Sequence, residues 1–269
     1  LVERGHEVSV YCRKGYGDET TPTHRGIHKI YLPKLAISVG ETLSHTFASL
    51  LHAFRSPPDV LIVMNPANGP LLLLPRLRGT PVAINVDGLE WRRSKWSWIG
   101  RQYLYAASWF STKVASTIIS DSRAIQAFYA RQWNAPSVYA SYGAEEEQST
   151  RPELIREFGL EADQYFLVVA RLEPENNTEL IVKPFKNTRP DKKLVVVGGV
   201  VYESDYVRRL RAEADERVVF TGPLYDQARL TELMCQSFAY VHGHMVGGTN
   251  PILLKALGCG ARILAADVD

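Results

Sequence analysis

Strand-like and helix-like segments alternate along the entire chain. Short, continuous apolar runs such as Val60 to Met64 are typical of parallel strands that are buried on both faces. Longer segments with apolar residues three and four positions apart, such as residues 38–54, predict amphipathic helices between these strands. The pattern predicts strands at 6–12, 27–33, 60–64, 81–86, 117–120, 137–142, 165–170, 193–199, 218–221, 238–241 and 262–266. It predicts helices at 38–54, 69–78, 97–113, 122–133, 152–158, 176–185, 204–214, 226–236 and from 251 onward.

A polar stretch separates two such runs. Residues 143–150 contain three consecutive acidic residues, and we interpret them as the connection between two domains, with a solvated loop inside one domain as the alternative. Each run has the size of one Rossmann-like domain. The sequence therefore predicts an α/β protein with two doubly wound domains, 1–147 and 148–269, that face a cleft. Ligands of such sheets bind at the carboxyl ends of the strands, here at 85–90, 170–177, 198–202 and 242–250.

Composition narrows the possible functions. The 269 residues include 31 basic and 29 acidic side chains, a formal net charge of +2, which argues against a dedicated nucleic-acid-binding protein. The three cysteines show no metal-ligand spacing and fit a reduced, cytosolic setting. No apolar run approaches the roughly 20 residues of a membrane-spanning helix, and no signal-peptide pattern is present.

Both ends of the chain resemble interrupted elements. The chain begins with what resembles the last turn of a helix, closed by Gly5, and stops just after a predicted strand. We therefore expect an internal fragment of a longer protein. In this prediction both domains are incomplete, the first without its first strand and the second without its C-terminal part.

The predicted site centres on a glycine-rich turn that precedes a helix. Asn250 is a suitable N-cap, and Pro251 fits the first helical position. We expect Gly247 and Gly248 to leave their backbone N–H groups bare at the helix N-terminus, where phosphate or sugar oxygens bind. Turns of this kind are common, so the neighbouring strand ends decide how this one is interpreted.

Two other strand ends carry candidate residues. Arg171 directly follows a predicted strand, where a guanidinium can pair with a diphosphate. An ion pair with Glu173 or Glu175 is the structural alternative. Gly198 and Gly199 permit a close approach of a ligand to the backbone, although a glycine pair is more often only a turn.

Asp87 and His244 are further candidates. Asp87 follows the strand at 81–86, where it can orient an acceptor hydroxyl or a sugar ring, or else cap a helix. His244 can hydrogen-bond a sugar, or be held by the backbone of its own loop. His242 and His244 have no third ligand in register, so no metal site is predicted.

Residues 91–113 have the most unusual composition in the chain. They contain four of the five tryptophans and five basic residues, but no acidic residue. Such a surface suits anionic lipid headgroups. The alternative is an ordinary core helix with a basic, solvated face. Nucleic-acid stacking uses similar residues, but the near-neutral net charge disfavours it.

Three strings in the sequence resemble a known family. They are Arg171-Leu-Glu-Pro-Glu-Asn-Asn177, His242-Gly-His-Met-Val-Gly-Gly-Thr-Asn-Pro251 and Asp87-Gly-Leu-Glu-Trp-Arg-Arg-Ser-Lys-Trp96. Together they resemble the bacterial rhamnosyltransferases of cell-wall and capsular polysaccharide synthesis. More widely, nearly the whole chain resembles family 4-like retaining glycosyltransferases of the GT-B fold.

The resemblance implies a reaction and its partners. A sugar, here L-rhamnose from dTDP-L-rhamnose, passes to a lipid-diphosphate-linked saccharide with retention of the anomeric configuration. No cofactor and no metal are implied beyond the nucleotide-sugar substrate, and no nucleic acid. The implied location is cytoplasmic, peripheral on the inner face of the plasma membrane.

The strand ends and the resemblance together assign roles to residues. The predicted catalytic residues are Asp87 and Arg171. The predicted donor-binding residues are Asn176, Gly198, Gly199, His244, Gly247, Gly248, Thr249, Asn250 and Lys255. On the acceptor or membrane side the prediction names Glu90, Trp91, Arg92, Arg93, Lys95 and Trp96.

Two features depart from the superfamily pattern. Asn176 stands where the superfamily has a lysine that binds the diphosphate. Gly247 and Lys255 stand where the superfamily has two glutamates. An ammonium cannot accept hydrogen bonds from ribose hydroxyls. Lys255 therefore pairs with the phosphate, weakens donor binding or points elsewhere, and in the second case Lys255→Glu raises donor affinity. A transferase for UDP- or GDP-sugars and a catalytically impaired nucleotide-sugar-binding paralogue are the alternative functions.

Overall fold

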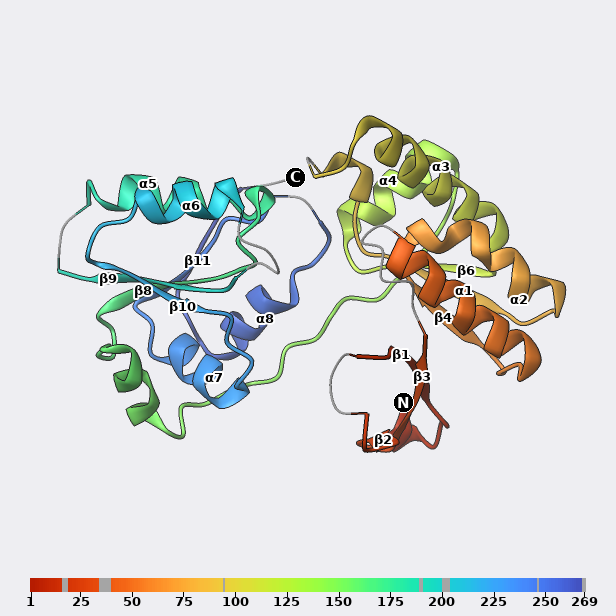
Figure 1. Cartoon of the computed structure of the whole chain (residues 1–269), viewed down its shortest axis with the longest axis horizontal. Helices are drawn as coiled ribbons and strands as arrows, with labels where there is room; N and C mark the ends of the chain where they lie inside the picture. The colour runs from red at the N-terminus through yellow and green to blue at the C-terminus, as the bar shows by residue number, and fades with distance from the viewer. Residues whose placement is uncertain are drawn as a thin grey trace. The chain divides into compact units, whose positions relative to one another are not determined.

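Two compact units divide the chain (Figure 1). The computed structural model describes residues 1–15, 19–33, 40–93, 95–188, 191–199, 204–245 and 247–267. The first unit contains residues 1–86, 102–120 and 126–138. The second contains residues 87–101, 121–125 and 139–269, so the segments that begin at Asp87 and Asp121 belong to it.

A four-stranded sheet forms most of the first unit. Its strands, in spatial order, are β4 (Leu61–Met64), β5 (Val82–Val86), β6 (Thr117–Ser120) and β7 (Val138–Tyr139), with β4, β5 and β6 parallel. The helical segments in this half of the chain are α1 (Gly40–Arg55), η2 (Pro66–Leu72), α2 (Leu73–Leu77), η3 (Glu90–Arg92), α3 (Trp98–Val114) and α4 (Arg123–Trp133). Ile84 and Val86 of β5 are completely buried, as expected of a central parallel strand.

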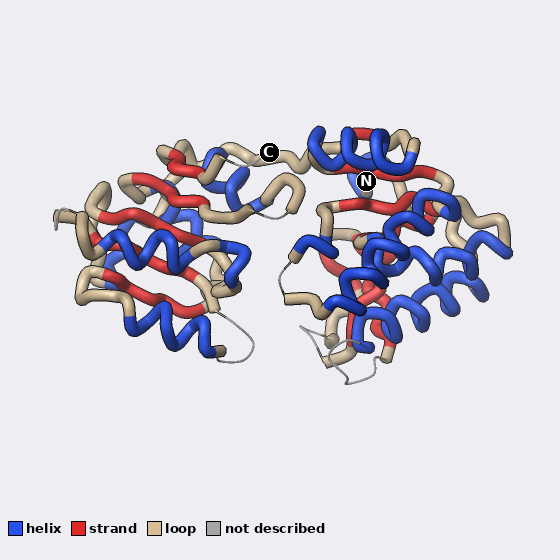
Figure 2. The backbone as a smooth tube through the Cα atoms, turned by 90° about the horizontal axis from the view of Figure 1, so that it is seen from above, coloured by secondary structure: helices blue, strands red, loops and turns tan. Residues whose placement is uncertain are grey.

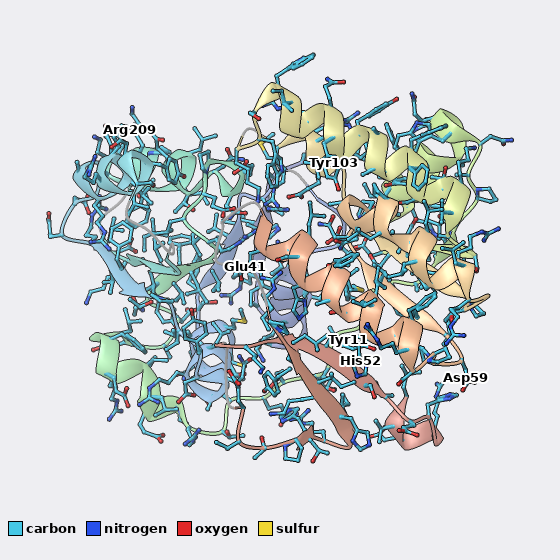
Figure 3. All side chains as sticks on the ribbon, turned by 45° about the vertical axis from the view of Figure 1, so that its right-hand side comes forward. Tyr11, Glu41, His52, Asp59, Tyr103 and Arg209 are labelled. Carbon is cyan, nitrogen blue, oxygen red and sulfur yellow. The ribbon has the colours of Figure 1, made fainter. Side chains whose placement is uncertain are left out.

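A separate three-stranded sheet lies near the start of the chain, after the short turn η1 (Val2–Arg4). Its strands are β1 (Ser9–Arg13), β3 (Ile27–Leu32) and β2 (Thr23–His24), in the order β1-β3-β2. The sheet contacts α1 through a 3.2 Å hydrogen bond between Tyr11 Oη and His52 Nδ1, which lie side by side in Figure 3. The apolar pattern does not predict β2. It forms because Arg25 and Gly26 both adopt positive φ, the conformation of a tight two-residue hairpin turn.

A five-stranded parallel sheet forms the centre of the second unit. Its strands, in spatial order, are β10 (Val218–Gly222), β9 (Lys193–Val197), β8 (Tyr165–Val169), β11 (Ala239–His242) and β12 (Ile263–Ala265). Helices α5 (Thr178–Phe185) and α6 (Asp205–Ala212) cover one face, and α7 (Gln227–Cys235) and α8 (Pro251–Gly258) cover the other (Figures 1 and 2). Each face has its own buried cluster, around Val182 and Leu210 on one side and around Leu233 and Ala256 on the other. The predicted doubly wound α/β architecture is confirmed.

Most predicted elements form, and the exceptions have local causes. The helix predicted at 69–78 is a 3₁₀ segment followed by the short α2, because Pro70 removes a backbone donor. The helix predicted from residue 176 begins at Thr178, because Pro174 to Asn176 form a 3₁₀ turn, η5, and Asn177 has a φ of 51°. Residues 38 and 39, and residues 200–202 of one predicted ligand turn, lie outside the described residues.

Candidate functional site

An open cavity of about 750 Å³ lies in the second unit at the carboxyl ends of β8, β9 and β11. From β8 the sheet continues through β9 and β10 on one side, and through β11 and β12 on the other. Ligands of doubly wound sheets bind where the strand order reverses in this way. The predicted site residues that line this cavity are Arg171, Asn176, Gly198, Gly199, His244 and Asn250.

Arg171 follows β8 and has an accessible guanidinium. Its side chain is 61% exposed, and Nη1 lies 3.4 Å from Oε1 of Glu173. The ion pair that we considered as the alternative to ligand binding is therefore present. An exposed pair of this kind contributes at most about 1 kcal/mol, so it leaves the guanidinium open to competition from an anion in the cavity.

Glu173 connects Arg171 to three of the residues predicted on the acceptor side. Arg93, which is 9% exposed, places Nη2 at 3.7 Å from Glu173 and Nη1 at 3.1 Å from Glu90. Lys95 Nζ lies 3.5 Å from Glu90. The segment after β5 thus brings the guanidinium of Arg93 to the loop that carries Arg171.

The rest of that segment is more exposed. Trp91 lies in the turn η3, and Arg92 is exposed. Trp96 is half-buried with Lys95 Nζ 5.2 Å from the centre of its ring. In the first turn of α3, Trp98 is 72% and Ile99 73% exposed, which leaves an apolar surface at the start of this helix.

Asn176 bridges two other residues of the cavity wall. Its Nδ2 donates to the backbone carbonyl of Arg171 at 2.7 Å, and its Oδ1 lies 2.7 Å from Nδ1 of His244. Only 7% of Asn176 is exposed. The structure therefore uses this amide to hold the side chain of His244 against the loop that follows β8.

Gly198 brings the ends of β8 and β9 together. A Cβ atom at this position would lie 1.8 Å from the carbonyl oxygen of Ala170, and φ is 149°. Only glycine permits this approach. Gly199 follows it, beside Pro223 of the turn after β10.

The glycine-rich turn before α8 is partly as predicted. Asn250 caps the helix, because its Oδ1 accepts from the N–H of Ile252 at 3.1 Å. The prediction of a bare N–H at Gly248 was wrong. That N–H donates to the carbonyl of Asp87 at 2.8 Å, and Thr249 Oγ1 donates to the carbonyl of Asp121 at 2.7 Å. The turn packs on the two segments that follow β5 and β6, so the N–H of Gly248 and the hydroxyl of Thr249 are already bonded.

Lys255 points away from the cavity residues. Its Nζ lies 2.7 Å from Oε1 of Glu147, in the connection between the two halves of the chain. Thr231 Oγ1 of α7 also lies within 3.5 Å of the Glu147 carboxylate. Of the three alternatives for Lys255, the geometry corresponds to the third, in which the side chain points elsewhere than to the donor.

Two aspartates stand beside the glycine-rich turn. Loss of hydration raises the pKa of Asp87. The negative charge of Glu90 raises this pKa further, whereas a hydrogen bond from the backbone N–H of Asp87 lowers it. Burial likewise raises the pKa of Asp121, and the charge of Asp87 adds to the effect. Asp121 is 1% exposed, and its Oδ1 has no hydrogen-bond partner in the described part of the chain.

Asp121 was not among the predicted site residues. The signal for it exists in the sequence, because Asp121 directly follows the strand at 117–120 as Asp87 follows the strand at 81–86. Both carboxylates therefore come from carboxyl ends of neighbouring parallel strands, β5 and β6.

Within the described ranges, no group of three or more histidine, cysteine, aspartate or glutamate side chains is arranged to hold a metal ion. Among the same residues, no helix has both the length and the apolar character needed to cross a membrane.

Family models match both halves of the chain. The glycosyl transferase 4-like domain matches residues 1–140, and the glycosyl transferases group 1 domain matches residues 163–269. No curated protein matches the chain in sequence.

Several solved glycosyltransferase structures share its fold. HepE of Anabaena, in complex with UDP and glucose, superposes with a TM-score of 0.73 at 16% identity, over 90% of this chain and 68% of HepE. Sucrose-phosphate synthase of Thermosynechococcus elongatus superposes with a TM-score of 0.78 at 17% identity, over 99% of this chain and 73% of that protein. The pneumococcal O-GlcNAc transferase GtfA, in complex with UDP and GlcNAc, gives 0.56 at 13% identity, over 86% and 46% of the two chains.

The fold and the matches to the two family models together identify the chain as a glycosyltransferase of the GT-B class. Because the first family model alone covers more than half of the 269 residues, the chain belongs to the glycosyl transferase 4-like family, with a group 1 domain in its second half.

Proposed function

We propose that this chain transfers a hexose from a nucleoside-diphosphate sugar that binds in the cavity of the second unit. The proposal rests on three features that lie together where the strand order of the sheet reverses. They are the exposed guanidinium of Arg171, the close backbone approach at Gly198 and the N-terminal end of α8. A cavity of about 750 Å³ also has the size typical of a site for a ligand of this kind.

The diphosphate gains negative charge as its bond to the sugar breaks. Preorganised positive charge at the leaving group is the largest catalytic contribution in such a reaction. Arg171 supplies a full charge once the diphosphate replaces Glu173 as its partner. The N-terminal end of α8 acts through its helix dipole, because the N–H of Ile252 is already bonded to Asn250.

The turns after β9 and β10 suit the nucleoside. Gly199, Pro223 and Tyr225 line this part of the cavity, and Tyr225 is 86% exposed. An accessible aromatic ring beside a glycine backbone offers a stacking surface for a planar base. We assign the base to these turns, which leaves the turn after β11 for the diphosphate and the sugar.

The sugar in our proposal is L-rhamnose, supplied as dTDP-L-rhamnose and transferred with retention to a lipid-diphosphate-linked saccharide. The three strings that resemble bacterial rhamnosyltransferases support this choice. Asp87 and Asp121 are carboxylates that can orient the acceptor hydroxyl. The exposed Trp98 and Ile99 supply an apolar contact for a membrane surface that carries the acceptor.

A UDP-hexose is the second candidate donor. It is favoured by the UDP and glucose bound to HepE and by the UDP and GlcNAc bound to GtfA. The base-binding turns proposed above accommodate uracil as well as thymine, because stacking on an aromatic ring is tolerant of the base.

A binding panel tests the proposal. The full chain is titrated with dTDP-L-rhamnose, UDP-glucose, UDP-GlcNAc and a GDP-sugar, and both thermal stabilisation and calorimetric Kd are measured. We expect dTDP-L-rhamnose to bind most tightly. Stabilisation by UDP-sugars alone would refute the rhamnose assignment, and binding of none of the four would refute the proposed function. With a lipid-linked acceptor, the anomeric configuration of the product, measured by NMR, tests retention.

A further inference from the structure

The carboxylate of Glu173 lies between two arginines. Its Oε1 lies 3.4 Å from Nη1 of Arg171, and its Oε2 lies 3.7 Å from Nη2 of Arg93. The side chain of Arg171 is 61% exposed, whereas that of Arg93 is only 11% exposed. Arg171 and Glu173 line the cavity, and Arg93 belongs to the segment predicted to face the acceptor. Glu173 therefore connects the arginine proposed for the diphosphate to that segment.

The contact between Glu173 and Arg93 is incomplete. Oε2 of Glu173 and Nε of Arg93 are both buried, and neither has a hydrogen-bond partner in the part of the chain that the structure describes. Nη1 of Arg93 donates to both carboxylate oxygens of Glu90 at 3.1 Å. The edge formed by Nε and Nη2 can hold a second carboxylate with two parallel hydrogen bonds. A shorter contact with Glu173 would therefore satisfy two buried polar atoms.

The charges of this network favour an anionic ligand. The cations Arg93, Lys95 and Arg171 stand against the carboxylates of Glu90 and Glu173, which leaves one positive charge in excess. A diphosphate that pairs with Arg171 competes with Glu173 for the same guanidinium, and it is repelled by the Glu173 carboxylate. The nearby guanidinium of Arg93 offers that carboxylate a second position.

We propose that Glu173 passes from Arg171 to Arg93 when the diphosphate of the donor binds. Arg93 is the positioning residue that makes this exchange favourable, because it neutralises the displaced carboxylate. The shorter contact holds the acceptor-side segment more closely against the loop after β8, so that donor binding and acceptor binding are coupled. This inference rests on the proposed function, in which the diphosphate replaces Glu173 as the partner of Arg171.

A double-variant cycle tests the exchange. The probes are dTDP, UDP and GDP, and the measured quantity is the calorimetric Kd of the one that binds most tightly. We expect Arg93→Gln to raise this Kd about three- to tenfold, because Glu173 then stays with Arg171. Glu173→Gln should lower the Kd about threefold, because it removes the competing charge. When Glu173→Gln is already present, Arg93→Gln should change the Kd by less than about twofold.

Two further variants serve as controls. Glu161→Gln removes an exposed carboxylate that precedes β8, at the opposite end of this strand from the cavity, and should leave the Kd unchanged. Arg93→Lys keeps the positive charge but loses the two-donor edge, so it should raise the Kd less than Arg93→Gln. If Arg93→Gln does not fold, as judged by urea denaturation, the same cycle with Arg93→Lys decides the question, with an expected rise of about twofold only while Glu173 is present.

The outcomes are distinct. An equal rise in Kd on loss of Arg93 with and without the Glu173 carboxylate overturns the exchange, because Arg93 would then act on the diphosphate directly. An unchanged Kd in the Arg93 variants, or an unchanged or higher Kd in Glu173→Gln, also overturns it. All of these results leave the proposed function intact. If the wild-type protein binds none of the three nucleoside diphosphates, the proposed function fails and this inference fails with it.

Discussion

Helix α8 separates two regions of the second unit that treat charge in opposite ways. On the cavity side, the side chain of Arg171 is 61% exposed and forms an ion pair with Glu173. On the linker side, which consists of Glu147, residues 149–151, Glu232 and Lys255, the Glu232 carboxylate is buried and the half-buried Lys255 pairs with Glu147. Glu232 is 2% exposed and accepts four hydrogen bonds, from Ser149, Thr150, Arg151 and Gln236.

The difference indicates that the two sides of the second unit have different roles. A saturated buried carboxylate stabilises the native state, because its partners have no other acceptor. An accessible guanidinium with a weak partner contributes little to stability and remains available for a ligand. Substitutions on the linker side should therefore change the free energy of unfolding, and substitutions on the cavity side should change ligand binding.

The largest expected effect is that of Glu232→Ala. The N–H groups of Thr150 and Arg151 each lie 2.7 Å from the Glu232 carboxylate and would lose their acceptor. We expect the free energy of unfolding to fall by about 2–4 kcal/mol, measured by urea denaturation. Glu161→Ala, at an exposed position, is the matched control and should change it by less than about 0.5 kcal/mol. A loss below about 1 kcal/mol in Glu232→Ala would contradict the stabilising role of the linker side.

Arg171→Ala should have the next largest effect, on binding. Loss of a guanidinium from a diphosphate should raise the Kd of the nucleoside diphosphate about 10- to 100-fold, or about 1.4–2.7 kcal/mol. The urea midpoint should not change. Arg209→Ala removes an exposed arginine from α6, labelled in Figure 3, and should leave the Kd unchanged. If the Arg171 and Arg209 variants bind the nucleoside diphosphate with equal Kd, Arg171 does not bind the diphosphate and the proposed role of the cavity side is wrong.

The pH dependence of stability should show a smaller effect of the same network. Burial raises the pKa of Glu232, but the hydrogen bonds from Ser149, Arg151, Thr150 and Gln236 outweigh it and hold the pKa below its ordinary value. A lowered folded-state pKa contributes stability above the unfolded-state pKa of about 4.3, and this contribution is lost as the pH falls through the folded-state pKa.

The measurement compares the wild-type protein with Glu232→Gln. The difference between their free energies of unfolding should be constant near neutral pH and should decrease as the pH falls below about 4.3. A difference that grows on acidification would mean that the carboxyl is stabilised in its protonated form, and the linker side would then not depend on a buried charge.

Local structure could be predicted from the sequence to a large extent, and long-range partners could not. The cap at Asn250, the start of α8 at Pro251 and the apolar strands follow from patterns within a few residues. Asn176, which contacts His244, lies 68 positions away from it, and Glu147, which pairs with Lys255, lies 108 positions away. No local pattern specifies which polar groups meet after the strands have packed.

The glycine-rich turn illustrates the same limit. Its glycines predicted bare N–H groups that face a ligand, but the sequence did not show which groups of the protein pack against them. At Gly248 the neighbour is the Asp121 carboxylate and the Asp87 carbonyl, and not a vacant position for a ligand. A steric requirement is visible in a sequence, whereas the group that imposes it is visible only in the folded chain.

Lys255 gives the smallest expected effect and the sharpest test of the boundary between the two regions. It lies on α8, four residues after Pro251, but its ammonium pairs with Glu147 on the linker side. Lys255→Glu would place two carboxylates together and should lower the free energy of unfolding by about 1 kcal/mol, with no change in donor Kd. The double variant Lys255→Glu with Glu147→Lys should recover most of that loss, because it restores the pair in the reverse order. If Lys255→Glu instead raises donor affinity, the cavity side extends along α8 to this residue and Lys255 does not belong to the linker side.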